Sequence, residues 1–174
     1  MTDPSTLVAA LGLQPHPEGG FYRETYRAPI EVPAAALPAH FAGGPRAAAT
    51  SIYFLLGTDD FSALHRIAAD ELWFFHAGDT LEVIGFLPGQ SSPTTWTLGL
   101  PPDGVPYALV PAGTTFGSRV RRDGPATPRH AHGFALVSCV VAPGFDFRDF
   151  AMPDRATLLS AYPDHAALVT SLTR

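Results

Sequence analysis

The chain has 174 residues, of which 46% are hydrophobic and 16% charged, and its formal net charge is −5. All 11 basic residues are arginine and 16 acidic residues outnumber them, which argues against nucleic acid as a partner because phosphate binding needs a basic surface. The apolar runs are far shorter than the roughly 20 residues that cross a membrane, and the lone cysteine, Cys139, fits a reducing compartment, so we expect a cytoplasmic protein that binds neither nucleic acid nor membrane.

Short strands dominate the predicted elements. Asp3 or Ser5 can cap a helix over residues 4–11 that Gly12 ends. After it, 16 glycines and 18 prolines divide the chain into short runs rich in β-branched and aromatic residues, a pattern typical of an all-β protein. The predicted strands are residues 21–27, 51–56, 62–67, 71–75, 81–87, 94–98, 107–110, 116–120, 134–142 and 145–150.

The remaining segments complete this picture. Residues 34–49 are rich in Ala, Pro and Gly and are predicted as a surface loop. The run 145–150 alternates charged and aromatic residues, which indicates an edge strand. Asp154 and Asp164 can cap two short helices within residues 154–172. Many short strands in a chain of this length favour a sandwich, a jelly roll or a barrel, and we expect one domain over 1–174 with its barrel over about 18–150.

The densest group of titratable and aromatic residues lies within residues 64–78. Its spacing resembles the first motif of the cupin superfamily, a His-x-His pair followed by a Glu and a closing Gly. Here they are His65, Glu71 and Gly78, with Ile67 in place of the second His. A second cupin-like motif, Pro-x-Gly-x-x-His, occurs at 111–116 with Phe116 in place of its metal-binding His.

Other segments are similar to one branch, the Cupin-5 (DUF985) family. They are residues 16–24, 50–56, 65–66, 70–73, 78–81, 110–113 and 141–150. The resemblance implies an all-β fold, the cupin double-stranded β-helix or jelly-roll barrel with short terminal helices. It also implies a homodimer, and we expect the first strand, about 21–26, to pack against the partner subunit, because aromatic residues are enriched in interfaces.

Strand alternation decides which side chains share the interior, because residues i and i+2 of a strand point to one face. If His65 faces inward, so does Ile67. On the next strand Glu71 and Trp73 share a face with Phe75, while His76 points the other way. On the first strand, Tyr22 and Glu24 form one row and Arg23 belongs to the other, and alternation does not choose between the rows.

His65 and Glu71 form the candidate catalytic pair. In an apolar setting their proton affinities are perturbed, so they can share a proton and act as acid and base next to a carbonyl. The alternative is a buried structural hydrogen bond between them. In metal-free cupin epimerases and isomerases, which the chain resembles, a tyrosine often returns the proton, which adds Tyr22 and Tyr53. The residues expected to contact a ligand are Arg23, Glu24, Arg66, Ile67, Trp73, Phe75 and Phe116.

The motif substitutions argue against a metal cofactor. Transition metals need three or more protein ligands and an open position, and only His65 and Glu71 of the usual cupin ligands are present. We therefore expect no cofactor, and these two residues as ligands if a metal binds. The nearby pair His130 and His132 lies in a polar turn and is expected to be solvated. Cys139, in an apolar strand, is expected to pack as a small apolar residue.

The motifs support three functions. The first is an enzyme for a small polar molecule, a sugar or sugar nucleotide, in which His65 and Glu71 move a proton as in an epimerase or isomerase. The second is a non-catalytic binding or sensor barrel in which the same residues only hydrogen-bond the ligand. The third is a metal-dependent cupin enzyme. Fold analogy alone does not choose among them.

Overall fold

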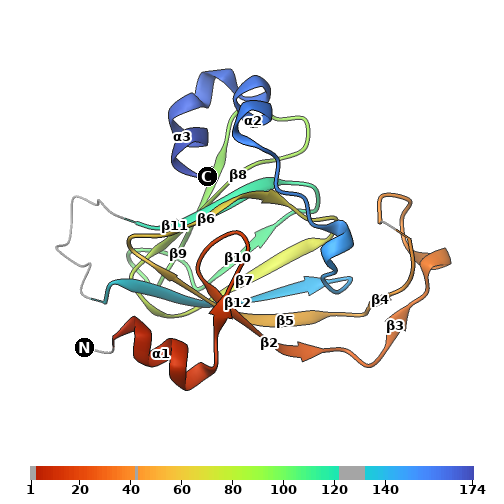
Figure 1. The fold of residues 1–174 in the computed structure, drawn as a ribbon, viewed down its shortest axis with the longest axis horizontal. Coiled ribbons are helices and arrows are strands. Elements are labelled where there is room, and N and C mark those ends of the chain that lie inside the picture. Colours follow the sequence, from red (N-terminus) through yellow and green to blue (C-terminus); the bar gives the residue numbers. More distant parts are fainter. Residues whose placement is uncertain (1–2, 42, 122–131) are drawn as a thin grey trace.

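Two antiparallel sheets face each other in the computed structural model, which describes residues 3–41, 43–121 and 132–174 (Figure 1). The larger sheet has six strands in the order β1 (Gln14–Pro15), β2 (Phe21–Arg27), β5 (Thr50–Gly57), β12 (Phe134–Ala142), β7 (Asp70–Gly78) and β10 (Tyr107–Val110). The smaller has four, in the order β6 (Phe61–Arg66), β11 (Thr115–Val120), β8 (Leu81–Phe86) and β9 (Thr94–Leu98). The all-β prediction is confirmed, although within the described residues the two sheets do not close into one continuous barrel.

The main core fills the space between the sheets. It forms because the strands alternate, so that every second side chain of each strand points inward. On β7 the inward row includes Glu71 and Trp73, both buried, as predicted. His76 contacts Ser138 and Tyr53 on the outer face of the larger sheet, which confirms that it points away from the interior. The largest buried apolar side chains of this core are Phe54, Leu56, Trp73, Leu81, Leu98 and Phe116.

Short helices cover the outer faces of both sheets. Helix α1 (Pro4–Leu11) begins at an Asp3 cap and ends at Gly12, as predicted, and packs on the larger sheet. Helices α2 (Arg155–Ala161) and α3 (Ala166–Ser171) pack on the smaller sheet at the C-terminal end of the chain (Figure 1). Asp154 caps α2 as predicted. The predicted cap at Asp164 is wrong, because this residue lies inside the 3-10 turn η3 (Pro163–His165) that precedes α3.

The segment predicted as a surface loop, 34–49, is only partly one. It contains a 3-10 turn, η1 (Ala34–Ala36), and a short strand, β4 (Arg46–Ala47), that pairs with β3 (Glu31–Val32). Arg46 is buried, and its guanidinium binds both carboxylate oxygens of Asp149 at 2.6 and 2.8 Å. This bidentate pair ties the segment to the chain that follows β12.

The predicted edge strand at 145–150 is wrong. The structure has a 3-10 turn, η2 (Phe147–Asp149), because the Asp146 carboxylate accepts a hydrogen bond from the Arg148 backbone N–H at 2.9 Å. Asp side chains that bond to nearby backbone in this way compete with strand pairing. The turn places Phe150 against the main core and leaves Phe147, which is 54% exposed, at the edge of the space between the sheets.

Candidate functional site

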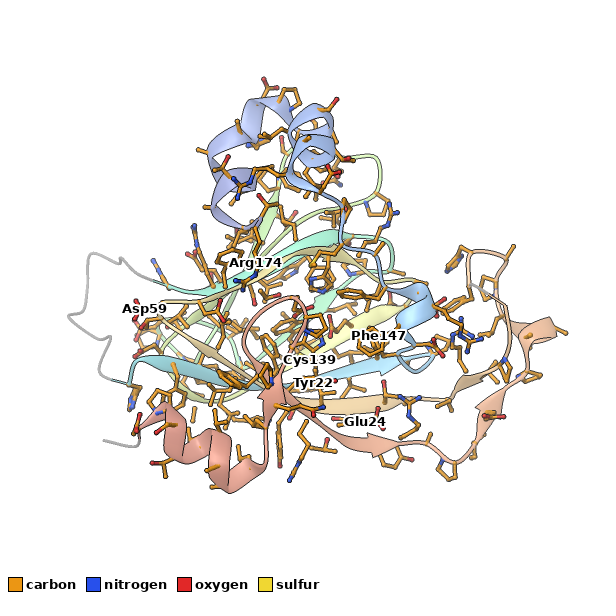
Figure 2. The ribbon with its side chains drawn as sticks, viewed as in Figure 1. Tyr22, Glu24, Asp59, Cys139, Phe147 and Arg174 are labelled. Atoms are coloured by element: carbon orange, nitrogen blue, oxygen red, sulfur yellow. The ribbon has the colours of Figure 1, made fainter. Side chains whose placement is uncertain are left out.

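A pocket of about 410 Å³ opens between the two sheets. Strands β1, β2, β5, β7 and β12 form one side, the end of β6 forms the floor, and the segment 145–150 forms part of the rim. Tyr22, Glu24, Cys139 and Phe147 mark it in Figure 2. The lining residues are Gln14, His16, Glu18, Tyr22, Glu24, Arg27, Thr50, Ile52, Phe54, His65, Ile67, Glu71, Trp73, Cys139, Val141, Phe145, Asp146, Phe147 and Phe150.

A β-bulge on β6 shapes the floor of the pocket. His65 pairs with Phe116 and Ser62 pairs with Ser118, so two residues of β6 lie opposite the single residue Gly117. The extra residue shifts the alternation, and both Ser62 and His65 contact the same neighbour, Glu18. A Cβ at Gly117 would collide with the backbone of β6, so the close approach of the bulged strand requires glycine there.

The loop between β1 and β2 carries Glu18 into the floor. It folds back on itself through the hydrogen bond from the His16 N–H to the Gly20 carbonyl at 3.0 Å. The bulge then holds Glu18 in two ways: the Ala63 N–H donates to its carbonyl at 2.8 Å, and the Ser62 hydroxyl donates to its Oε1 at 2.9 Å. Backbone and side chain together fix the position of this buried carboxyl.

Both ring nitrogens of His65 have partners. Its Nδ1 lies 2.8 Å from the Ala63 carbonyl, and its Nε2 lies 3.3 Å from Glu18 Oε2. Because a carbonyl can only accept, Nδ1 carries the proton of the neutral ring. Nε2 then presents a lone pair to Glu18. His65 is also coupled electrostatically to Glu71, so it stands between two carboxyl groups, in contact with one and within the field of the other.

The two buried carboxyl groups bind protons more tightly than usual. Burial raises the pKa of Glu18 to about 7, against the opposing effects of His16 and the Ser62 hydrogen bond. Burial likewise raises the pKa of Glu71 to about 7, which His65 lowers and the charge of Glu18 raises further. Both groups therefore change protonation near neutral pH, as acid–base catalysis requires.

The two histidines of the floor are shifted the other way. Burial lowers the pKa of His65, and the charge of Glu71 only partly offsets this. Burial also lowers the pKa of His16, whose ring packs edge-on against Tyr22 with 4.5 Å between the ring centres. Both imidazoles are consequently neutral at pH 7, and they face carboxyl groups that gain or lose a proton at that pH.

A buried hydrogen-bond donor next to Glu71 has no satisfactory partner. Within the described residues, Trp73 Nε1–H makes no hydrogen bond of ordinary geometry, although its proximity to the Glu71 carboxylate favours the charged form of that group. The Cys139 thiol lies beside the same carboxylate, and burial raises its pKa. An unsatisfied buried N–H costs about 1–3 kcal/mol, and the Glu71 carboxylate is the acceptor beside this donor.

Charges at the rim are paired with one another. Arg27 donates to both oxygens of Glu24 at 3.1 and 2.7 Å. The Arg148 guanidinium beside Asp146 holds the pKa of that carboxyl well below its usual range. Between these pairs the walls are largely aromatic. The pocket thus combines a titratable floor, aromatic walls and a rim whose charges are already compensated.

Comparison with known proteins assigns the family. The model of the cupin superfamily family DUF985, Cupin_5, matches residues 5–153. The chain belongs to this family. A solved protein of Shewanella oneidensis is 40% identical, with a TM-score of 0.83 over 100% of this chain and 99% of that one. A hypothetical protein from Leishmania major is 34% identical, with a TM-score of 0.85 over 99% of each chain.

More distant cupins share the fold alone. A cupin 2 conserved barrel domain protein from Rhodopseudomonas palustris is 13% identical, with a TM-score of 0.55 over 90% of this chain and 81% of that one. No curated protein matches the chain. The family and the cupin fold suggested by the motifs are thereby confirmed.

The donor set of this cupin does not fit the usual metal site. Ile67 and Phe116 occupy two ligand positions with apolar side chains, and the Nε2 of His65 faces Glu18. Across the described parts of the chain, no group of three or more potential ligands is arranged to hold a metal ion. Of the other predicted histidines, His132 is exposed and His130 lies outside the described residues.

Six predicted site residues come together in the pocket. They are Tyr22, Glu24, His65, Ile67, Glu71 and Trp73. The row of β2 that faces the interior is therefore the one with Tyr22 and Glu24. Cys139 is buried as expected, but it also lines the pocket.

Five other predicted residues do not line the pocket. Tyr53 and Arg23 lie on the outer face of the larger sheet, where the guanidinium covers the tyrosine ring at 5.9 Å. Arg66 is exposed, and its backbone pairs with Ala151. Phe75 and Phe116 face inward but belong to the core around the pocket. Alternation explains the positions of Arg23 and Tyr53. Arg23 follows Tyr22 directly on β2 and therefore points to the opposite face, and Tyr53 pairs with Arg23 in register across β2 and β5 and shares its face.

Among the titratable residues of the pocket floor, His16 and Glu18 are the two that sequence reasoning missed. Both lie in a segment recognised as a family hallmark but not as part of the site. The available signal was the pattern of two titratable residues followed by two glycines, directly before a strand. Both glycines have a positive φ, which turns the loop back into the pocket.

Proposed function

We propose that this cupin is an enzyme that moves a proton on a small polar carbonyl compound, in the manner of an isomerase or epimerase, with His65 and Glu71 as its acid–base pair. The observation that carries the proposal is the perturbed pKa of both groups in one largely apolar pocket. Titratable groups with opposed shifts in a cleft are typical of active sites.

The chemistry requires two groups that exchange protons near neutral pH. One takes a proton from the carbon next to the carbonyl, and the other supplies a proton to the opposite face or to the carbonyl oxygen. Glu71, with its pKa raised to about 7, is matched to such a transfer. The Trp73 N–H is a candidate donor to the oxygen on which charge develops, and removing one such donor typically costs 10²–10³ in rate.

A carbohydrate is the substrate class that we favour. Sugars stack on aromatic walls and hydrogen-bond to scattered polar groups, and the pocket offers both: Tyr22 and Phe147 among the aromatic residues, and Gln14 and Thr50 among the polar ones. The volume, about 410 Å³, lies within the range of about 300–1,000 Å³ for small-molecule sites. The charge of Arg27 is already compensated by Glu24, so the rim offers little attraction for a phosphate there. A sugar linked to a nucleotide would therefore keep its phosphate groups outside the rim.

Hydrogen exchange tests the proposal even while the product is unidentified. The protein is incubated in D₂O with a panel of free sugars, sugar phosphates and nucleotide sugars, and NMR records the loss of the proton next to the carbonyl. We expect exchange with at least one compound, and a reduction of 10²–10⁴-fold in His65→Gln and Glu71→Gln. Glu31→Gln, an exposed carboxyl on β3, is the matched control and keeps the wild-type rate.

A non-catalytic binding barrel is the second candidate, and the aromatic walls and polar groups of the pocket favour ligand binding in either case. His65→Gln distinguishes the two functions, because it keeps a hydrogen-bonding side chain but removes one member of the acid–base pair. If a ligand binds both forms equally and neither exchanges its protons, the binding function stands and the enzymatic one is refuted.

We also propose that the chain forms a homodimer through its first long strand. Strand β2 exposes most of its residues, including Tyr26, which is 53% exposed. Large aromatic side chains on a surface strand are typical of interfaces. Light scattering at micromolar concentration checks this, with twice the chain mass expected; Tyr26→Glu would shift the mass toward one chain, and a single-chain mass for the wild type would refute the dimer.

The reducing cytoplasm is the location that we propose. Cys139 is buried and forms no disulfide among the described residues, and no described helix has the length and apolar character needed to cross a bilayer. Cell fractionation checks the location.

A further inference from the structure

Glu18 Oε2 faces two imidazole nitrogens that both act as acceptors. His16 Nδ1, 3.5 Å away, accepts the Glu18 backbone N–H at 3.3 Å, so the proton of that ring lies on its other nitrogen. His65 Nε2, 3.3 Å away, is unprotonated in the neutral ring because Nδ1 bonds to the Ala63 carbonyl. Backbone groups therefore leave neither nitrogen with a proton to donate to Glu18 Oε2: the His16 Nδ1 lone pair accepts the Glu18 N–H, and the His65 Nε2 lone pair faces the carboxyl oxygen.

An ionised Glu18 would be poorly placed between these lone pairs. Its Oε2 would be a buried anion with no donor from either ring, a costly arrangement in a site that excludes water. A protonated carboxyl satisfies every contact: Oε2–H donates to His65 Nε2, and the carbonyl oxygen Oε1 accepts the Ser62 hydroxyl at 2.9 Å. Among the described charged groups near Glu18, Arg174 contacts its backbone carbonyl at 3.5 Å, and the coupled Glu71 carboxyl is acidic and supplies no positive charge.

We propose that Glu18 is a carboxylic acid in the resting protein. Its proton, hydrogen-bonded to His65 Nε2, is the proton that the site donates. The Glu18–His65 pair is then the proton-donating end of the pocket, and Glu71 the proton-accepting end. The direction of transfer rests on the proposed function, whereas the location of the proton does not. Burial, which raises the pKa of Glu18 to about 7, acts in the same sense.

The step balances without a further reactant. Glu71 takes a proton from the carbon next to the carbonyl, and the electron pair of that C–H bond moves to the carbonyl oxygen. The Glu18 proton, shared with His65 Nε2, is delivered to the other face of the carbon as the carbonyl re-forms. Glu71 ends protonated and Glu18 ionised, and proton exchange with water restores both. Glu18 thus acts as a proton store that keeps His65 neutral and positioned.

Nitrogen-15 NMR of the free protein tests the location of the proton. The His65 ring signals are assigned by their loss in His65→Gln and followed from pH 5 to pH 9. At pH 6.5 we expect a neutral ring protonated at Nδ1 with an unprotonated Nε2 that accepts a hydrogen bond. A ring protonated at both nitrogens at that pH would mean an imidazolium beside a carboxylate and would overturn the proposal.

Glu18→Gln is the variant that separates a proton store from a structural contact. Its amide N–H₂ can donate to Nε2 as the carboxylic acid does, so the neutral ring and the fold are retained. Its side chain cannot ionise, and the comparison is made in the Glu71→Gln background because Glu71 also titrates near pH 7 and acts on His65. In that background the change of the His65 signals near pH 7 disappears with Glu18→Gln, whereas Glu31→Gln keeps it. An unchanged titration in Glu18→Gln would contradict the inference.

Activity distinguishes this inference from the proposed function. With an exchanging substrate in hand, Glu18→Gln reduces formation of the isomerised product by 10²-fold or more, while exchange through Glu71 continues. Wild-type product formation in Glu18→Gln would refute the role of Glu18 in transfer. If the NMR result holds and no compound exchanges, the proton is located correctly and the enzymatic function alone fails.

Discussion

Phe116 lies directly opposite His65 across β11 and β6, with 4.3 Å between the two ring centres. In the cupin motif that this segment resembles, a metal-binding histidine stands at the position of Phe116. The pairing therefore brings the two motif positions face to face, as in a metal site, but fills one of them with an aromatic ring. His65 consequently packs against carbon on this side and contacts a carboxyl, Glu18, on the other.

Restoring the two missing donors tests this relationship. The double substitution Ile67→His and Phe116→His places two imidazoles near His65 and Glu71, and transition metals bind sites with three or more such ligands. We expect near-stoichiometric divalent metal in the purified double variant, measured by elemental analysis, and less in Phe116→His alone. No metal in the double variant, with folding verified by circular dichroism, would show that the positions do not converge.

Glu71 makes stability depend on pH. Its folded pKa is raised to about 7 from an ordinary value of 4.5, so the folded chain retains a proton that the unfolded chain releases. The stabilising contribution is complete below about pH 4.5 and is lost as pH rises through about 7. Glu71→Gln removes this loss, and we expect it to gain on the order of 1–3 kcal/mol relative to wild type between pH 5 and pH 8.

Urea unfolding of the variant and the wild type at pH 5 and at pH 8 measures this gain in stability. Burial also lowers the pKa of His16 and His65, which makes folding less favourable as pH falls, but both proteins contain these residues and the comparison largely cancels them. An equal difference between variant and wild type at the two pH values would contradict the prediction.

The buried pair of Arg46 and Asp149 anchors the rim of the pocket. Arg46 also donates to the carbonyls of Gly44 and Pro45 at 2.9 and 3.0 Å. Arg46→Met removes all of these bonds and leaves a buried carboxyl without its bidentate partner, which costs about 3–5 kcal/mol. Arg148→Met is the matched control: it breaks an exposed pair with Asp146, which solvent screens and which contributes far less to stability than the buried pair. Comparable losses in urea unfolding would contradict this difference.

Gly19 is required by the close packing of the loop that carries Glu18. Its φ is +118°, and a Cβ there would collide with the Phe61 carbonyl and the Arg174 side chain. Gly89 also has a positive φ, of +77°, but a Cβ there meets nothing within 4 Å. We expect Gly89→Ala to cost roughly 1–2 kcal/mol from backbone strain alone, and Gly19→Ala about 3 kcal/mol or more.

The readout for these glycines is the free energy of unfolding together with the His65 NMR signals. Displacing the loop moves Glu18 away from His65, so Gly19→Ala alters the ring signals and Gly89→Ala leaves them unchanged. If Gly19→Ala and Gly89→Ala had equal effects, the position of the loop would not depend on the close approach of Gly19 to Phe61.

Alternation and short motifs predict much of the fold from the sequence. Runs of β-branched and aromatic residues locate the strands that carry His65, Glu71 and Trp73, and period two puts Glu71 and Trp73 inside and His76 outside. Asp3 and Asp154 are recognisable as caps because capping depends on residues within one turn. Each of these features is set by neighbours in the chain, so the chain displays it directly.

Contacts between distant segments were decided by the tertiary structure. Glu18 reaches His65 because the loop before β2 folds onto a bulge in β6, and the bulge gives Ser62 and His65 the same partner despite their odd spacing. The Asp146 carboxylate competes for nearby backbone N–H groups, and a turn forms where an edge strand was predicted. This turn brings Phe147 to the pocket.

The sequence by itself thus determined most of the strands, the family and two of the four titratable residues of the pocket floor, His65 and Glu71. Only the tertiary structure decided that the carboxyl in contact with His65 is Glu18 and that Tyr53 and Arg23 lie on the outer face. The physical reason is that alternation sets faces only along an unbroken strand: a single extra residue reverses the pattern, and which loop covers the bulge depends on packing across the whole fold.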